Sequence, residues 1–239
     1  MDAVDRALIP HGPSDRTDLT AFLERAKRVD DSGVLRAQQR PDGRVGLWIR
    51  TGFDILATRS VFGTVSPTDV ICDIAAMSSS VGGDGPVAVG FALPGAWQGA
   101  LPPADGFEHL DDVPARELIA LSRKGVDVAR TESGALGPAS SLLDQPVLEV
   151  TGHRADAGPT AEVAKVSEVA KVSMRAVFAL TAMGFVRDAA GHEVTEDSPL
   201  DRIAADEPVR VRISSSWVRV DARFGSVYQR RSVLNLGVL

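Results

Sequence analysis

Apolar and charged residues alternate along two stretches near the C-terminus, and this alternation constrains the fold more than any other feature of the sequence. The first stretch is Val209-Arg210-Val211-Arg212-Ile213, and the second is Trp217-Val218-Arg219-Val220. Successive side chains of a β-strand point to opposite faces of the sheet, so a period of two predicts half-buried strands with outward arginines. We therefore expect antiparallel strands over residues 209–215, 217–224 and 227–233.

The same segment is basic, whereas the rest of the chain is acidic. Residues 207–239 hold six arginines and two acidic residues, a net charge of +4, while the whole chain carries −6. Residues 1–206 therefore carry −10. An asymmetry of this kind indicates a binding partner. The residues that we expect to contact nucleic acid or another partner are Arg210, Arg212, Trp217, Arg219, Arg223, Arg230 and Arg231.

Two interpretations of these arginines stay open. A row of cations on one face of a twisted sheet would bind phosphate groups, with Trp217 or Tyr228 stacking on a base. Alternatively, the arginines form an ordinary solvated sheet face that protects strand edges and pairs with the acidic remainder of the chain. We favour the second interpretation because the arginine runs are short and Asp221 interrupts one of them.

A concentration of chain-breaking residues indicates two parts. Residues 94–106 contain three glycines and three prolines, a composition typical of a connection between domains. We predict an N-terminal α+β part over residues 1–98 and a C-terminal α+β part over residues 99–239 that carries the basic hairpin. The expected fold class is α+β, with two packed parts, antiparallel sheets and a long central helix near residues 160–185.

Within the N-terminal part, a helix is expected from Ser14 to Val29, where apolar residues recur with helical spacing. A short helix over residues 70–77 and a buried strand over residues 86–93 are expected further on. Between the first helix and these elements, an antiparallel meander is predicted over residues 34–39, 44–51 and 54–65.

Within the C-terminal part, Asp111 or Asp112 is expected to cap a helix that Gly125 divides. A strand is expected over residues 147–151. The long helix is predicted because residues 160–185 are apolar over a wide arc of a helical wheel. This segment includes two tandem copies of Glu-Val-Ala-Lys-Val-Ser. Six residues do not complete a whole number of helical turns, so the two copies would face different directions on a helix.

No complete catalytic, metal or nucleotide signature is present in the sequence. The acidic residues and the histidine of residues 105–112 fit no established metal-binding spacing, and carboxylates ahead of a helix are favoured by the helix dipole alone. We therefore expect no cofactor and no metal, and lean towards a protein that is not an enzyme. If it is an enzyme, its pocket is expected between the two parts, lined by Trp97, Phe107, Glu108 and His109.

The sequence offers no sign of a membrane or an oxidising compartment. It has no apolar run long enough to span a bilayer, and no secretory signal at its N-terminus. A single cysteine, Cys72, excludes an internal disulfide. These observations predict a cytoplasmic protein.

Two stretches carry a resemblance to a known family. Residues 97–108 (WQGALPPADGFE), followed by Val113-Pro114-Ala115, form one; residues 179–185 (ALTAMGF), followed by Trp217-Val218-Arg219 and residues 225–230, form the other. Together they resemble a family of uncharacterised actinobacterial proteins known only as domains of unknown function, mainly over residues 95–231. The resemblance implies one chain with two α+β parts and no catalytic residues.

These observations lead to a best guess and two alternatives. The best guess is a non-enzymatic protein-interaction or regulatory module that self-associates, as a homodimer for example, because its acidic and basic surfaces complement each other between copies. The alternatives are nucleic-acid binding through the arginine-bearing strands and a small-molecule enzyme with a site between the two parts.

Overall fold

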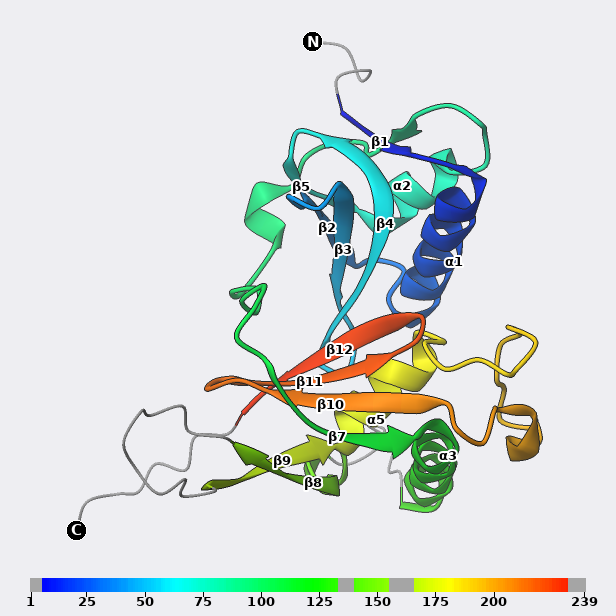
Figure 1. Cartoon of the computed structure of the whole chain (residues 1–239). Helices are drawn as coiled ribbons and strands as arrows, with labels where there is room; N and C mark the ends of the chain where they lie inside the picture. Colours follow the sequence, from blue (N-terminus) through cyan, green and yellow to red (C-terminus); the bar gives the residue numbers. More distant parts are fainter. Residues whose placement is uncertain (1–5, 133–139, 155–165, 232–239) are drawn as a thin grey trace, which may run out of the picture. The chain divides into compact units, whose positions relative to one another are not determined.

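A computed structural model describes residues 6–132, 140–154 and 166–231 of the chain (Figure 1). It consists of two compact units: unit 1 comprises Met1–Leu101 with Ala182–Gly184, and unit 2 comprises Pro102–Thr181 with Phe185–Leu239. Each unit combines antiparallel strands with helices. The α+β class expected from the sequence is therefore confirmed.

Unit 1 is built around an antiparallel sheet with the strand order β5-β2-β3-β4, and β1 pairs with both β4 and β6. The predicted meander is confirmed as β2, β3 and β4. The strands are β1 (Ala7–Pro10), β2 (Val34–Gln39), β3 (Arg44–Arg50), β4 (Leu56–Ser66), β5 (Asp69–Asp73) and β6 (Val87–Ala88). The helices are α1 (Pro13–Val29), α2 (Ile74–Ser80) and the short 3₁₀ turn η2 (Pro94–Ala96).

The first helix and the first hairpin follow directly from local sequence. Helix α1 buries the stripe that the periodicity predicts, including Leu19, Phe22 and Leu23, and it packs against α2. Strands β2 and β3 meet at a tight turn in which Gly43 has a φ of +76°, a conformation that glycine adopts without strain. Arg40 N donates to Arg44 O (2.8 Å) and closes that turn.

Two predictions for unit 1 were wrong. The predicted helix over residues 70–77 is strand β5 as far as Asp73, because alternate residues Val70 and Cys72 are buried against the sheet. Helix α2 begins only where Asp73 Oδ1 accepts a hydrogen bond from Ala76 N (2.8 Å). The predicted buried strand over residues 86–93 is paired only at Val87–Ala88. Gly90, with a φ of +70°, turns the chain, and Phe91 is 86% exposed.

Unit 2 contains a four-stranded antiparallel sheet with the order β12-β11-β10-β7 and a separate hairpin of β8 and β9. The strands predicted for the C-terminal segment are confirmed as β10, β11 and β12, although residues 232 and 233 lie outside the described residues. The strands are β7 (Glu108–Pro114), β8 (Pro146–Arg154), β9 (Val166–Ser173), β10 (Pro208–Ile213), β11 (Trp217–Ala222) and β12 (Gly225–Arg230). The helical elements are α3 (Ala115–Glu132), α4 (Ser140–Leu143), α5 (Met174–Ala182) and η3 (Leu200–Arg202).

The long central helix is shorter than predicted. Residues 160–165 lie outside the described residues, residues 166–173 form strand β9, and only α5 is helical. Alternate residues Ala170 and Val172 are buried while Lys171 between them is exposed, the pattern of a half-buried strand. The valines of the repeat are β-branched and favour a strand over a helix. The Ser173 hydroxyl, which accepts from Ala176 N (3.4 Å), marks the start of the helix.

Helix α3 differs from its prediction in two respects, which are the residue at which it begins and its continuity at Gly125. Asp111 and Asp112 belong to strand β7, so the helix begins at Ala115 and not at an aspartate cap. Gly125 does not divide it. A Cβ at Gly125 would lie 2.6 Å from the Met174 sulfur, so this glycine permits the close approach of α3 and α5.

Candidate functional site

The arginines of the C-terminal strands lie on one face of the unit 2 sheet. Val209, Val211 and Ile213 of β10 are buried on the inner face, which places Arg210 and Arg212 on the outer face. Helix α5 lies behind β10 and β11 in Figure 1. The cross-strand register places eight residues on the outer face, here named the arginine face: Arg210, Arg212, Trp217, Arg219, Asp221, Ser226, Tyr228 and Arg230.

Asp221 is the centre of the arginine face. It is 8% exposed, and its carboxylate accepts hydrogen bonds from Arg212 Nη1, Arg219 Nε (2.6 Å) and Ser226 Oγ. Strand pairing sets Arg212 directly opposite Arg219, so one carboxylate lies between two guanidinium groups. Such charge-assisted hydrogen bonds are about twice as strong as neutral ones. Asp221 interrupts only the second arginine run in the sequence, yet in the structure it joins the two runs.

Aromatic rings surround these arginines. The Arg219 guanidinium lies 5.7 Å from the ring centre of Phe107 and 5.5 Å from that of Tyr228. The two rings meet edge to face at 5.7 Å. At the other end of the strands, the Arg230 guanidinium lies 4.5 Å from the ring centre of Trp217. The planar cations are thus held against aromatic surfaces.

Strand β7 adds an acidic border beside the arginine face. In the paired strands, Asp112 is opposite Arg210 and His109 is opposite Arg212. His109 Nε2 and Asp112 Oδ1 are 2.7 Å apart. Asp112 is exposed, whereas Asp111 and Glu108 are opposite the buried Val211 and Ile213 and therefore lie on the other face of the sheet. A polyanion on the arginine face would meet the Asp112 carboxylate at its edge.

The environment of Arg212 is unfavourable for a cation. Burial lowers the pKa of its guanidinium, and repulsion by Arg219 and Arg210 lowers the pKa further, while Asp112 acts in the opposite direction. An arginine remains protonated at physiological pH in spite of such a shift. The lowered pKa thus reflects burial first and the two neighbouring arginines second.

Two arginines from the predicted set do not belong to the arginine face. Arg223 is exposed in the turn between β11 and β12, 3.9 Å from Glu207 Oε2. Arg231 follows β12; its Nη1 donates to Ser214 O (2.9 Å) and its Nη2 to Glu168 Oε2 (3.2 Å). Arg231 thus connects β9 to the turn between β10 and β11, which is a structural role.

The residues of the predicted pocket fall in different units. Trp97 is in unit 1, where its Nε1 donates to Gly99 O (3.1 Å). Phe107, Glu108 and His109 are in unit 2, at and just before the start of β7. The pocket itself stays a prediction. Among the residues that the structure describes, no group of three or more histidine, cysteine or acidic side chains could hold a metal ion.

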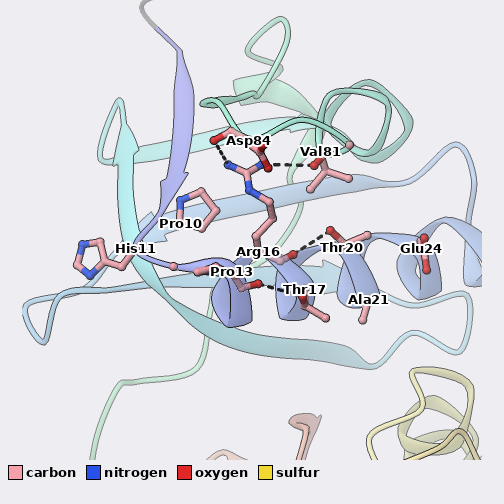
Figure 2. A pocket seen from close by; sticks show the side chains of 12 residues that line it. Pro10, His11, Pro13, Arg16, Thr17, Thr20, Ala21, Glu24, Val81 and Asp84 are labelled. Carbon is pink, nitrogen blue, oxygen red and sulfur yellow. Dashed lines mark hydrogen bonds between the residues drawn. The ribbon is translucent and has the colours of Figure 1, made fainter.

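A cavity that the sequence did not indicate lies in unit 1, between the first half of α1 and the loop after α2 (Figure 2). Its volume is about 740 Å³. The Arg16 side chain points across it and donates to Val81 O (3.3 Å) and Asp84 O (3.2 Å). The guanidinium therefore satisfies backbone carbonyls and holds the loop to α1. Only the pairing of a helix with a distant glycine-rich loop creates this cavity, and such pairing leaves no local sequence signal.

Comparison with protein families identifies the chain. A family model described as a domain of unknown function, DUF8185, matches residues 102–234. The chain belongs to this family. A second model, also described as a domain of unknown function, DUF8010, matches residues 3–99. The resemblance to domains of unknown function is confirmed, and the actinobacterial origin stays a prediction. No curated protein matches the chain.

Comparison with solved structures shows what the fold resembles. The DNA polymerase III beta subunit of Caulobacter crescentus matches with a TM-score of 0.51 and 14% identity, over 94% of this chain and 64% of its own. The sliding clamp of Bartonella birtlesii, bound to griselimycin, matches with 0.51 and 13%, over 96% and 66%. The DNA polymerase beta subunit of Streptococcus pyogenes matches with 0.52 and 12%, over 94% and 64%.

At these identities the likeness concerns the fold, and the chain spans less than two thirds of the length of the first of these proteins. It extends through both units, because 94% or more of this chain is covered. The chain is thus a two-part α+β protein with a fold like that of sliding-clamp domains. In the described part of the chain, no helix is both long enough and apolar enough to cross a membrane.

Proposed function

We propose that this protein is a non-enzymatic, cytoplasmic interaction module with a clamp-like fold, which associates with copies of itself and with other protein chains. The observation that carries the proposal is the likeness of both units to sliding clamps. Those proteins are by name clamps and polymerase subunits, and a subunit works within an assembly of chains. The step from this shared fold to a shared role is an analogy, because one fold hosts many functions.

The charge distribution supports self-association. The last 33 residues carry +4 and the remainder carries −10, so opposite charges on two copies attract one another. On the arginine face, Arg210 and Arg230 are exposed, and Arg230 is held in place by Trp217. Basic and acidic surfaces at different places on one chain favour a head-to-tail contact between copies.

Sedimentation velocity tests this proposal directly. Measured from about 1 to about 200 μM protein, the average mass is expected to rise towards a dimer or a larger closed assembly. Raising the salt from about 50 to about 500 mM is expected to reduce the association, because salt screens exposed charges. A single chain at every concentration, in low and high salt, would refute self-association.

Nucleic-acid binding is a second candidate function, and the fold shared with DNA polymerase subunits favours it. The geometry of the arginine face supports it less well, because Asp221 already binds Arg212 and Arg219 and because β7 is acidic. An electrophoretic shift with duplex and single-stranded DNA distinguishes the two candidates. A salt-sensitive shift that is lost on changing Arg219 and Arg223 to Glu would support this second function.

A further inference from the structure

Three arginine side chains surround one buried carboxylate at the centre of the arginine face. Arg212 stands opposite Arg219, and Arg210 stands opposite Asp221. Like charges directly opposite each other on neighbouring strands are destabilising. Asp221 compensates one of the three positive charges and Asp112, opposite Arg210 on β7, compensates a second, so one remains for another anion to compensate.

The arginines have hydrogen-bond donors to spare and can be reached from solvent. A guanidinium carries five N–H donors, and Arg212 and Arg219 each use one of them on Asp221. Their side chains are 27% and 28% exposed, respectively. Arg210 is exposed and, in the part of the chain that the structure describes, forms no ion pair. A carboxylate arriving from solvent can therefore accept from these groups without displacing Asp221.

An apolar surface adjoins these donors. Phe107 is half-buried and packs edge to face on Tyr228, and Arg219 lies between the two rings and the centre of the face. An apolar side chain next to a bound carboxylate would pack against Phe107. Aromatic and arginine side chains together are the groups most enriched where proteins bind one another tightly.

The acidic border limits the length of the ligand. Asp112 of β7 is exposed and is opposite Arg210 at the edge of the arginine face. A nucleic acid carries a charge at every nucleotide and would place phosphates against the Asp112 and Asp221 carboxylates. A peptide with one or two acidic residues beside an apolar residue avoids that repulsion. The border therefore favours a short acidic peptide over a polyanion.

We propose that the arginine face binds a short acidic segment of a partner protein. One carboxylate of the segment is held by Arg210, Arg212 and Arg219, and a neighbouring apolar side chain packs on Phe107. This inference rests on the proposed function and names the chemistry of the partner that the interaction module would bind.

Fluorescence anisotropy with a fluorescein-labelled peptide, Gly-Glu-Phe-Glu-Gly, tests the inference on the full chain. The peptide is expected to bind, and the same peptide with glutamine in place of glutamate is expected to bind at least about tenfold more weakly, because it lacks the charge-assisted hydrogen bonds. Arg210→Gln is expected to weaken binding about three- to tenfold. Arg210 is exposed and forms no ion pair among the described residues, so this variant is expected to fold.

Arg130→Gln is the matched control. Arg130 is 63% exposed in the same unit, pairs with Glu196 and lies on α3, so the variant changes the net charge equally and leaves the face intact. Equal binding of the two peptides, or equal effects of Arg210→Gln and Arg130→Gln, would overturn the inference. Displacement of the peptide by a single-stranded DNA oligonucleotide at lower concentration than by unlabelled peptide would also overturn it. Failure of peptide binding with intact self-association refutes only this inference, whereas a strict monomer that binds the peptide refutes only self-association.

Discussion

Replacing Asp221 with asparagine should destabilise unit 2 more than removing either arginine beside it. The substitution keeps the size of the side chain but leaves two guanidinium groups facing each other without a carboxylate between them. Breaking a buried charge network by removing its shared partner costs about 3–5 kcal/mol when the network is fully buried. Because the Arg212 and Arg219 side chains are 27% and 28% exposed, we expect a smaller loss of about 2–4 kcal/mol.

Comparison with Arg212→Gln tests whether the carboxylate or the arginine contributes more to stability. Arg212→Gln removes one hydrogen bond to Asp221 but also relieves the repulsion between Arg212 and Arg219, so it should cost about 1 kcal/mol or less. In the double variant Asp221→Asn/Arg212→Gln, the loss of unfolding free energy should be smaller than the sum of the losses in the two single variants. The reason is that the introduced asparagine then faces one guanidinium group and not two like charges. We expect the difference between the sum and the measured loss to exceed about 1 kcal/mol.

Urea unfolding of the three variants, followed by circular dichroism, measures these free energies. A loss below about 0.5 kcal/mol for Asp221→Asn would refute the reasoning, since changes of that size are typical of surface positions without a network. An Arg212→Gln variant that is less stable than Asp221→Asn would refute it as well, because it would place the stabilising charge on the arginine and not on the carboxylate.

Two further predictions concern packing and pH. Gly225→Ala should lower the free energy of unfolding in urea by about 1–3 kcal/mol, because the added Cβ would lie 2.4 Å from the buried Phe185 ring. The control Gly82→Ala, where the added Cβ would have no atom within 4 Å, should change stability by less than about 0.5 kcal/mol. Equal effects of the two substitutions would contradict the packing argument. The Arg36 guanidinium lowers the pKa of Asp69 through its side-chain hydrogen bonds, so this pair should stabilise unit 1 above the usual aspartate pKa of about 3.9 and lose that contribution as the pH falls below it. Arg36→Gln should therefore flatten the stability profile between about pH 5 and pH 2, and an unchanged slope would count against the pair.

The sequence predicts most of the fold wherever a pattern has a single structural meaning. Strict alternation over residues 209–213 and 217–220 has no helical interpretation, and β10 and β11 are where it places them. The apolar stripe of α1 is equally unambiguous. By contrast, the valines and alanines of residues 166–173 fit a helix and a strand alike, and pairing with β8 decides between them. Residues 108–114 contain several carboxylates, which are typical of the start of a helix. Pairing with β10 nevertheless makes this segment a strand.

The candidate site was predictable only in part, for a similar reason. Alternation places Arg210, Arg212 and Arg219 on one face, but it makes Asp221 look like an interruption of a basic run. Its contact with Arg212 depends on the register of the β10–β11 hairpin, which brings together residues nine apart in the chain. The position of Phe107 beside Arg219 joins residues more than a hundred apart. Long-range neighbours of this kind are set by the fold and leave no trace in the local pattern.

The repeat that includes β9 has a consequence for how this chain can tolerate changes in length. Residues 162–167 and 168–173 have the same sequence, and six is an even number, so along a strand both copies present the same side chains to the same face. Loss of one copy in frame would still supply Glu-Val-Ala-Lys-Val-Ser directly ahead of Met174, with the buried alanine and valine in place. The shortening would fall on the connection between β8 and β9, so this hairpin is a place where the chain can gain or lose one repeat while the sheet keeps its inner and outer faces.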